Sequence, residues 1–193
     1  MKLNDAERDV LVRLGDPEPP ARHREVIDDT LRHCVNSIRS PAFVLSPQWD
    51  VVYWNDAFAA AWLIDVPGSA PFNAVEYQFS RARERGLQGK RWELMSRRMA
   101  AQFRADYLAR AGDPLFQPLI DRLRAIPVFR EMYDTGDVIS SLADVPNAIE
   151  HPILGLIDYV TYNLAVPDTG LTLTVQLVSD EIAAALAARR RTD

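Results

Sequence analysis

Cysteine is nearly absent from this sequence, since Cys34 is the only one. A single thiol excludes a framework of internal disulfides, which is typical of small secreted domains. No segment at the start resembles a signal peptide, and no stretch approaches the roughly 20 consecutive apolar residues of a membrane span. These absences predict a cytoplasmic protein without a membrane segment.

An excess of positive charge is also missing, because the sequence has 22 Lys and Arg and 27 Asp and Glu, for a net charge of -5. Proteins that bind nucleic acid need clustered Lys and Arg to neutralise phosphates. The arginines between Arg81 and Arg98 are interleaved with Glu84 and Glu93, which is typical of a solvated surface. We do not expect the chain by itself to bind DNA.

Motifs for catalysis or metal binding are scarce. The histidines His23, His33 and His151 are scattered, with no Cys or carboxylate beside them at the spacing of a zinc site. The sequence has no G-x-S-x-G motif, and we interpret Cys34 as a buried structural thiol on the apolar face of a helix. The sequence therefore predicts a protein that is not an enzyme and carries no cofactor.

Two segments at the start of the chain stand apart from the rest. Asn4 to Leu14 is predicted to form a short helix, and Asp16 to Pro20 holds three prolines that favour an extended connector. We expect residues 1–20 to be a helical extension with a proline-rich connector. Residues 21–193 are then long enough for one domain with a substantial core.

Within that domain the periodicity of apolar residues predicts two hairpins separated by helices. The hairpins cover Ala42 to Trp54, and Ile153 to Val166 with Leu171 to Val178. The expected helices run from Arg22 to Ile38, from about Asn55 to Trp62, from Lys90 to Ala111, around Leu115 to Leu123, from Pro127 to Tyr133, and from Ser179 to Arg189. This order predicts an α+β fold whose antiparallel sheet is built from two hairpins distant in sequence and covered by helices.

Large aromatic and methionine side chains are concentrated in the middle third of the chain. At helical spacing they fit a tightly packed core, and rings with adaptable methionines equally suit the wall of an apolar ligand pocket. Both interpretations stay open. The candidates for the pocket wall are Trp54, Phe58, Trp62, Trp92, Met95, Met99, Phe103, Phe129 and Met132.

Several short segments, taken in order, carry a resemblance to a known family. They are Ser40 to Leu45, Trp49 to Asn55, Asp113 to Leu115, Phe129 to Tyr133, His151 to Gly155, and the Tyr159 strand leading to Pro167 and Asp168. Together they resemble the ligand-binding domain of MmyB-like transcription regulators, over roughly residues 40 to 178. The resemblance implies a PAS-like sensor domain that binds a small apolar or amphipathic ligand, with fatty acids as the suggested class.

In that family the domain follows an Xre-type helix-turn-helix domain, and Leu3 to Arg8 resembles the segment joining the two. The resemblance therefore implies contact with DNA only through a helix-turn-helix domain, which this chain lacks, and a homodimer is a further candidate assembly. Arg130 and His151 are candidates to hold a ligand carboxylate, the alternatives being a structural salt bridge for Arg130 and a backbone-bonded turn for His151. The rival function is an interaction or dimerisation module with a filled core.

Overall fold

The computed structural model describes residues 27–64, 71–81, 87, 89–110, 113–114, 116–136 and 147–189. The helix expected over Asn4 to Leu14 and the proline connector lie outside these ranges. The division between residues 1–20 and 21–193 therefore stays a prediction.

The first described helix, α2, spans Asp29–Ser37 and begins where the Asp28 side chain accepts a hydrogen bond from the Leu31 amide over 2.7 Å. Its buried side is formed by Val35, against which Leu31 and other partly buried apolar residues pack. Cys34 is exposed, so its interpretation as a buried thiol is wrong. Leu31 and Val35 are four residues apart and define the stripe that faces the sheet, whereas Cys34 lies at the edge of that stripe.

The predicted first hairpin is confirmed as β1, Ala42–Leu45, and β2, Asp50–Trp54, which pair antiparallel. Asn55 follows β2 and caps the next helix, α3 (Asp56–Ala61), by accepting from the Phe58 amide over 2.9 Å. The same Oδ1 accepts from the Ala42 amide, while Nδ2 donates to the carbonyls of Ile38 and Ser40. One buried amide thus joins the end of α2, the start of β1 and the start of α3.

Residues 71–81, for which the sequence pattern predicts no helix or strand, contain three short elements. Strand β3, Phe72–Asn73, pairs with β2 and is followed by α4, Ala74–Glu76, which the Asn73 side chain caps. The chain then widens into a π-helical turn, η1, over Tyr77–Arg81. This turn directs Gln78 and Phe79 into the interior.

Three helices follow close to their expected positions. Helix α6 spans Lys90–Ala109, α7 spans Gln117–Arg124 and α8 spans Pro127–Thr135. Gly136 ends α8 in the left-handed conformation, at φ 79°, which a residue without Cβ adopts at little cost.

The last part of the chain holds β4, Asn147–His151, β5, Gly155–Ala165, β6, Thr172–Leu177, and α9, Asp180–Arg189. The β5–β6 hairpin and the final helix are confirmed. The expected start of the strand at Ile153 is wrong, because residues 152–154 form the turn between β4 and β5. Strand β4 itself was not predicted.

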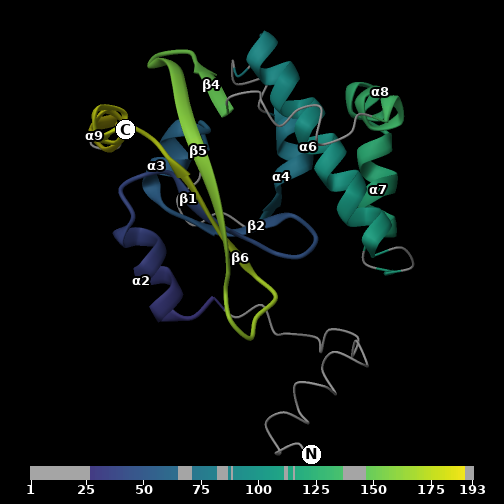
Figure 1. Cartoon of the computed structure of the whole chain (residues 1–193), viewed down its shortest axis with the longest axis horizontal. Coiled ribbons are helices and arrows are strands. Elements are labelled where there is room, and N and C mark those ends of the chain that lie inside the picture. Colours follow the sequence, from purple (N-terminus) through teal and green to yellow (C-terminus); the bar gives the residue numbers. More distant parts are fainter. Residues whose placement is uncertain are drawn as a thin grey trace, which may run out of the picture.

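All neighbouring strands pair antiparallel in the order β3-β2-β1-β6-β5-β4 (Figure 1). The pairing of β1 with β6, in which Phe43 faces Thr174, joins the two hairpins that are distant in sequence. This arrangement confirms the α+β, PAS-like prediction. No helix in the described part of the chain is both long and apolar enough to cross a bilayer.

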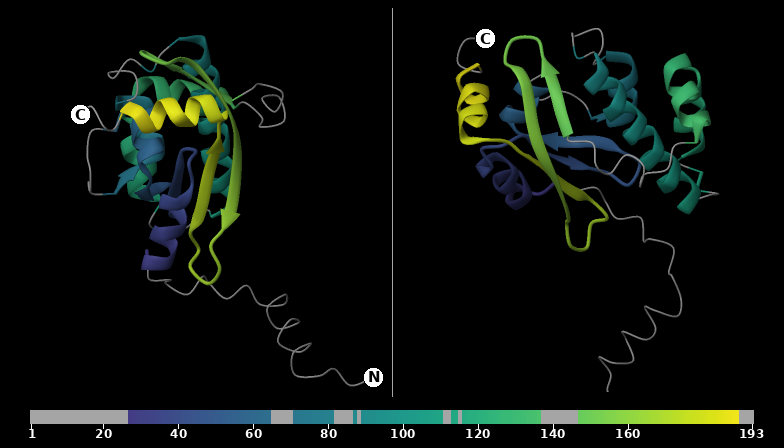
Figure 2. Two further views of the ribbon diagram at one scale, coloured as in Figure 1. Left: turned by 90° about the vertical axis from the view of Figure 1, so that its left-hand side faces the viewer. Right: turned by 45° about the horizontal axis from the view of Figure 1, so that its top comes forward.

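The two faces of the sheet have different cover. On the inner face, side chains such as Phe43, Val51 and Ile157 pack with residues of α3, α6 and α9 into the main core. On the outer face, α2 packs over β1 and β6 through a smaller cluster around Val35 and Val44. In the right-hand view of Figure 2, α6, α7 and α8 lie to the right of the strands, and α2 and α9 lie to the left.

Candidate functional site

The nine apolar side chains predicted to line a pocket all belong to the main core or pack against it. Six of them are buried in the cluster and three are partly buried at its margin. The buried ones are Phe58, Trp62, Trp92, Phe103, Phe129 and Met132, and the partly buried ones are Trp54, Met95 and Met99. The structure therefore brings together side chains from β2, α3, α6 and α8.

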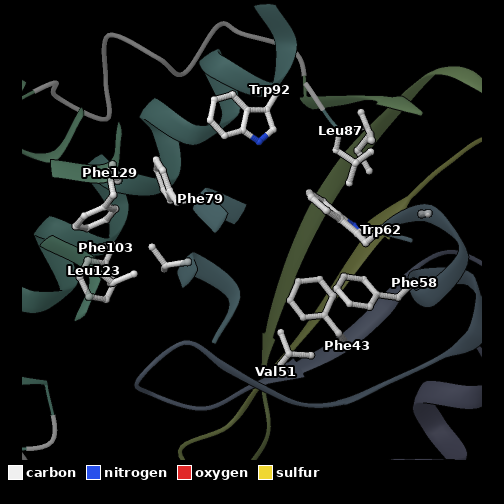
Figure 3. Packing of buried hydrophobic residues seen from close by; sticks show 14 of the residues in the cluster. Phe43, Val51, Phe58, Trp62, Phe79, Leu87, Trp92, Phe103, Leu123 and Phe129 are labelled. Atoms are coloured by element: carbon white, nitrogen blue, oxygen red, sulfur yellow. The ribbon is translucent and has the colours of Figure 1, made fainter. Parts of the chain in front are cut away.

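One group of rings lies on the strand side of this cluster. The ring centroids of Phe43 and Phe58 are 4.4 Å apart, and those of Phe58 and Trp62 are 6.1 Å apart. The indole of Trp62 donates to Gln176 Oε1 over 2.8 Å, which fixes the ring against β6. Figure 3 shows these three rings beside the strands.

A second group of rings lies on the helix side. Phe129 is at its centre, with Phe79 at 5.1 Å and Phe103 at 6.0 Å between centroids, both nearly edge-on. Phe79 also meets Trp92 edge-on at 6.3 Å. In Figure 3 the rings of Phe79, Phe103 and Phe129 lie opposite the strand-side rings. The candidate site is the apolar cluster that these two groups form together.

Few polar groups enter this region, and the sequence pattern gave no signal for the most buried of them. Gln78 and Ser96 are 1% and 0% exposed, and Gln78 Nε2 donates to Ser96 Oγ over 2.8 Å. The Trp92 indole donates to the backbone carbonyl of Gln78 over 3.3 Å. A compact polar cluster is thus set between η1 and α6.

Tyr159, on the inner face of β5, is a second buried polar group. Its hydroxyl donates to Met95 Sδ over 3.2 Å. Burial raises the pKa of Tyr159, and the nearby Arg98 lowers it by a smaller amount. The phenol is therefore neutral and supplies a weakly bonded hydroxyl beside α6.

His151 lies at the end of β4 and is 2% exposed. Its Nδ1 accepts from the amides of Ile153 and Leu154, at 3.2 and 3.0 Å, and its Nε2 donates to the carbonyl of Ala60. Burial lowers the pKa of His151, although the bond to Ala60 opposes this shift. Both ring nitrogens are engaged by the backbone, which corresponds to the backbone-bonded turn considered for this residue.

Arg130 lies on the exposed side of α8, whereas its neighbour Phe129 is buried. The structure thus places the two carboxylate candidates on separate elements, with Arg130 on α8 and His151 beside α3. Among the side chains that the structure describes, no group of three His, Cys, Asp or Glu is placed to hold a metal ion.

A groove of about 300 Å³ runs along the surface between α6 and α8. Its wall includes Trp92 and Met132, two of the predicted pocket residues, and its rim carries the Glu93–Arg97 ion pair at 3.2 Å. Because Trp92 also bonds to Gln78, its indole separates this groove from the buried polar cluster.

A sequence model described as the MmyB-like transcription regulator ligand binding domain matches residues 27–190. No curated protein matches the chain.

Proposed function

Because this chain belongs to the MmyB-like transcription regulator ligand-binding domain family, we propose that it senses a fatty-acid-like amphiphile bound among its buried rings. The observation that carries the proposal is the convergence of aromatic and methionine side chains from four elements on the inner face of the sheet. Ligand pockets combine such apolar walls with a few placed polar groups. Among the described residues, Gln78, Ser96, Tyr159 and Gln176 are polar groups of this kind.

The tail of the ligand is expected to dominate its affinity. Burying one methylene contributes roughly 0.8 kcal/mol, so about twelve of them contribute about 10 kcal/mol before costs. A hydrogen bond to a charged group contributes only about 1.5–3 kcal/mol. Association costs an estimated 4–15 kcal/mol, so the fit of the tail decides whether binding is measurable.

In this proposal the domain binds and releases its ligand without reacting with it, in the cytoplasm. Occupancy biases the arrangement of α6 and the strands, since both supply residues to the same cluster. A helix-turn-helix domain, which is not among the elements described, would convert that bias into a change in DNA binding. Arg130 and His151 are assigned at most a secondary part in holding a charged head group.

Native mass spectrometry of the purified protein tests the proposal. We expect an adduct with the mass of an amphiphile, which denaturation releases and solvent extraction identifies. Thermal melts with added amphiphiles give an independent measurement, because a ligand that binds only the folded state raises the melting temperature. If the purified protein carries no adduct and no amphiphile raises its melting temperature, the sensor function is excluded.

The alternative function, a dimerisation module, is favoured by one specific surface. The outer face of β5 and β6 exposes five large apolar side chains, each between 47% and 56% exposed, next to the part that α2 covers. They are Leu156, Val160, Tyr162, Leu164 and Leu177. Asp158 is the one charged residue on this face of β5, so the surface is more complementary to a second copy of itself than to a charged partner.

Sedimentation of the purified chain distinguishes the two functions. If dimerisation is the main role, Tyr162→Glu converts a dimer to a monomer, while amphiphiles leave the melting temperature unchanged. The control is Asn163→Glu, which places the same charge at the next position of β5, on the other face of the strand.

A further inference from the structure

The carbonyl oxygen of the Gln78 side chain is buried without a donor. Its own amide nitrogen is committed to Ser96 Oγ at 2.8 Å, and within the described residues no group donates to Oε1. The Trp92 indole, which lies beside it, donates instead to the backbone carbonyl of Gln78. Such an atom is unusual, because most buried polar atoms in folded proteins have a hydrogen-bond partner.

The arrangement around Gln78 is specific. Ser96 is 0% exposed in the middle of α6, where alanine has the higher helix propensity. Its hydroxyl holds Nε2 and thereby fixes the direction of Oε1. Gln78 itself lies in the π-helical turn η1, and such turns are frequent at functional sites. An oriented acceptor is therefore maintained at a position where an apolar side chain would pack without a desolvation cost.

On the basis of the function proposed above, we propose that Gln78 Oε1 accepts a hydrogen bond from the head group of the ligand. The preferred ligand is an aliphatic chain that carries a neutral O–H group, such as a long-chain alcohol. A carboxylate has no proton to donate, and its oxygens would face Oε1 with like partial charge in an apolar site. The rings of Phe79 and Trp92 provide the apolar surface for the adjacent chain.

The test compares ligands that differ only in the head group. Calorimetry with the full chain measures the Kd of dodecanol, of dodecyl methyl ether and of dodecanoate at neutral pH. The ether keeps the tail and the oxygen but has no proton to donate. We expect dodecanol to bind about tenfold more tightly than the ether, the ratio that one hydrogen bond typically gives.

Variants locate the effect. In Gln78→Met, of similar size and shape, the two Kd values should lie within about twofold of each other. Ser96→Ala removes the acceptor of the Gln78 amide, whose Nε2 can then donate to the ether oxygen. This variant should also reduce the ratio between the Kd values of the ether and dodecanol. The matched control is Gln102→Met on the exposed face of α6, which should keep the tenfold ratio.

Each outcome bears on a different proposal. Three results would contradict the role of Gln78 and leave the sensor function standing. Dodecanol and the ether could bind the unmodified protein equally, or the tenfold ratio of their Kd values could persist in Gln78→Met. Dodecanoate could also bind more tightly than dodecanol. If none of the three ligands binds, the sensor function itself is wrong. The comparison in the unmodified protein decides the matter even where a variant does not fold.

Discussion

The imidazole of His151 joins two elements that are 91 residues apart in the sequence, because its Nε2 donates to the backbone carbonyl of Ala60 in α3 over 3.3 Å. Its Nδ1 accepts hydrogen bonds from two backbone amides of the turn that leads into β5. A neutral ring satisfies all three bonds, whereas a proton on Nδ1 would break two of them. The turn and the end of α3 therefore depend on the neutral form.

The first prediction concerns pH. Burial lowers the pKa of His151 below its ordinary 6.5, so below about pH 6.5 the unfolded chain binds a proton that the folded chain does not. The free energy of unfolding should therefore fall as the pH drops through this value, until the lower pKa of the folded state is reached. Urea melts at a series of pH values from about 7.5 to about 5.5 measure this free energy.

The variant His151→Asn isolates this contribution, because Asn can accept from the turn amides and does not titrate. We expect its free energy of unfolding to depend less steeply on pH than that of the unmodified protein. His33→Asn, on the exposed surface of α2, is the matched control and should keep the original slope. Equal slopes for all three proteins would show that His151 does not govern stability in this range.

The second prediction concerns Asn55. Its side chain accepts from two amides and donates to three carbonyls at the junction of α2, β1 and α3. Asn55→Ala removes these hydrogen bonds together with a helix cap, which should cost about 3 kcal/mol or more. For a chain of this size that corresponds to a melting temperature lower by about 10 °C.

Asn36→Ala, which removes one exposed hydrogen bond to Tyr53, provides the comparison for Asn55. It should change the melting temperature by little, since exposed contacts contribute little to stability. A similar loss in both variants would contradict the central role of Asn55.

Local signals in the sequence were sufficient for much of this fold. The alternating apolar residues of Ala42 to Trp54 predicted the first hairpin. The helix expected from about Asn55 begins at Asp56, with Asn55 as its cap. Strand β4 escaped prediction because Asn147 to His151 has few β-branched residues. It forms a strand because it pairs with β5, and the local sequence pattern does not indicate this pairing.

The main core was predictable in composition but not in detail. Aromatic and methionine residues at helical spacing indicated which side chains enter the main core, since apolar periodicity shows which face of a helix is buried. The polar groups escaped notice, because the burial of Gln78 depends on a π-helical turn that packs against Ser96. The contact of Trp62 with Gln176 spans 114 residues and likewise follows only from the pairing of β1 with β6.

The third prediction concerns residues 1–20. The apolar stripe expected in Asn4 to Leu14 is short, and the prolines separate it from the rest of the chain. Deleting residues 1–20 should lower the melting temperature by less than about 10 °C, a change of at most a few kcal/mol for a domain of this size. A larger loss, measured by circular dichroism, would show that this segment belongs to the folded domain.

The fourth prediction separates the wall of the pocket from its charged candidates. Met99→Gln keeps the size of the side chain and introduces a polar amide beside the core, so it should abolish stabilisation by amphiphiles. Arg130→Gln, at an exposed position on α8, should only weaken it. Melts of both folded variants with dodecanoate provide the measurement. The opposite order of effects would indicate that a charged anchor holds the ligand.

The last prediction concerns the length of the ligand tail. If the rings around Phe103 and Phe129 enclose an aliphatic chain, each added methylene that finds apolar contact contributes roughly 0.8 kcal/mol. The affinity should then rise about threefold to fourfold per methylene, until the chain exceeds the space between the two groups of rings.

A series of straight-chain alcohols from about eight to about sixteen carbons tests this dependence, with the shift in melting temperature as the measurement. We expect the shift to increase with length and then to level off or reverse, because overfilling an apolar interior is unfavourable. Phe103→Leu enlarges the space on the helix side and should move the turning point to longer chains. A shift that is independent of length would mean that the rings form a filled core, and the dimerisation function would then take the place of the sensor.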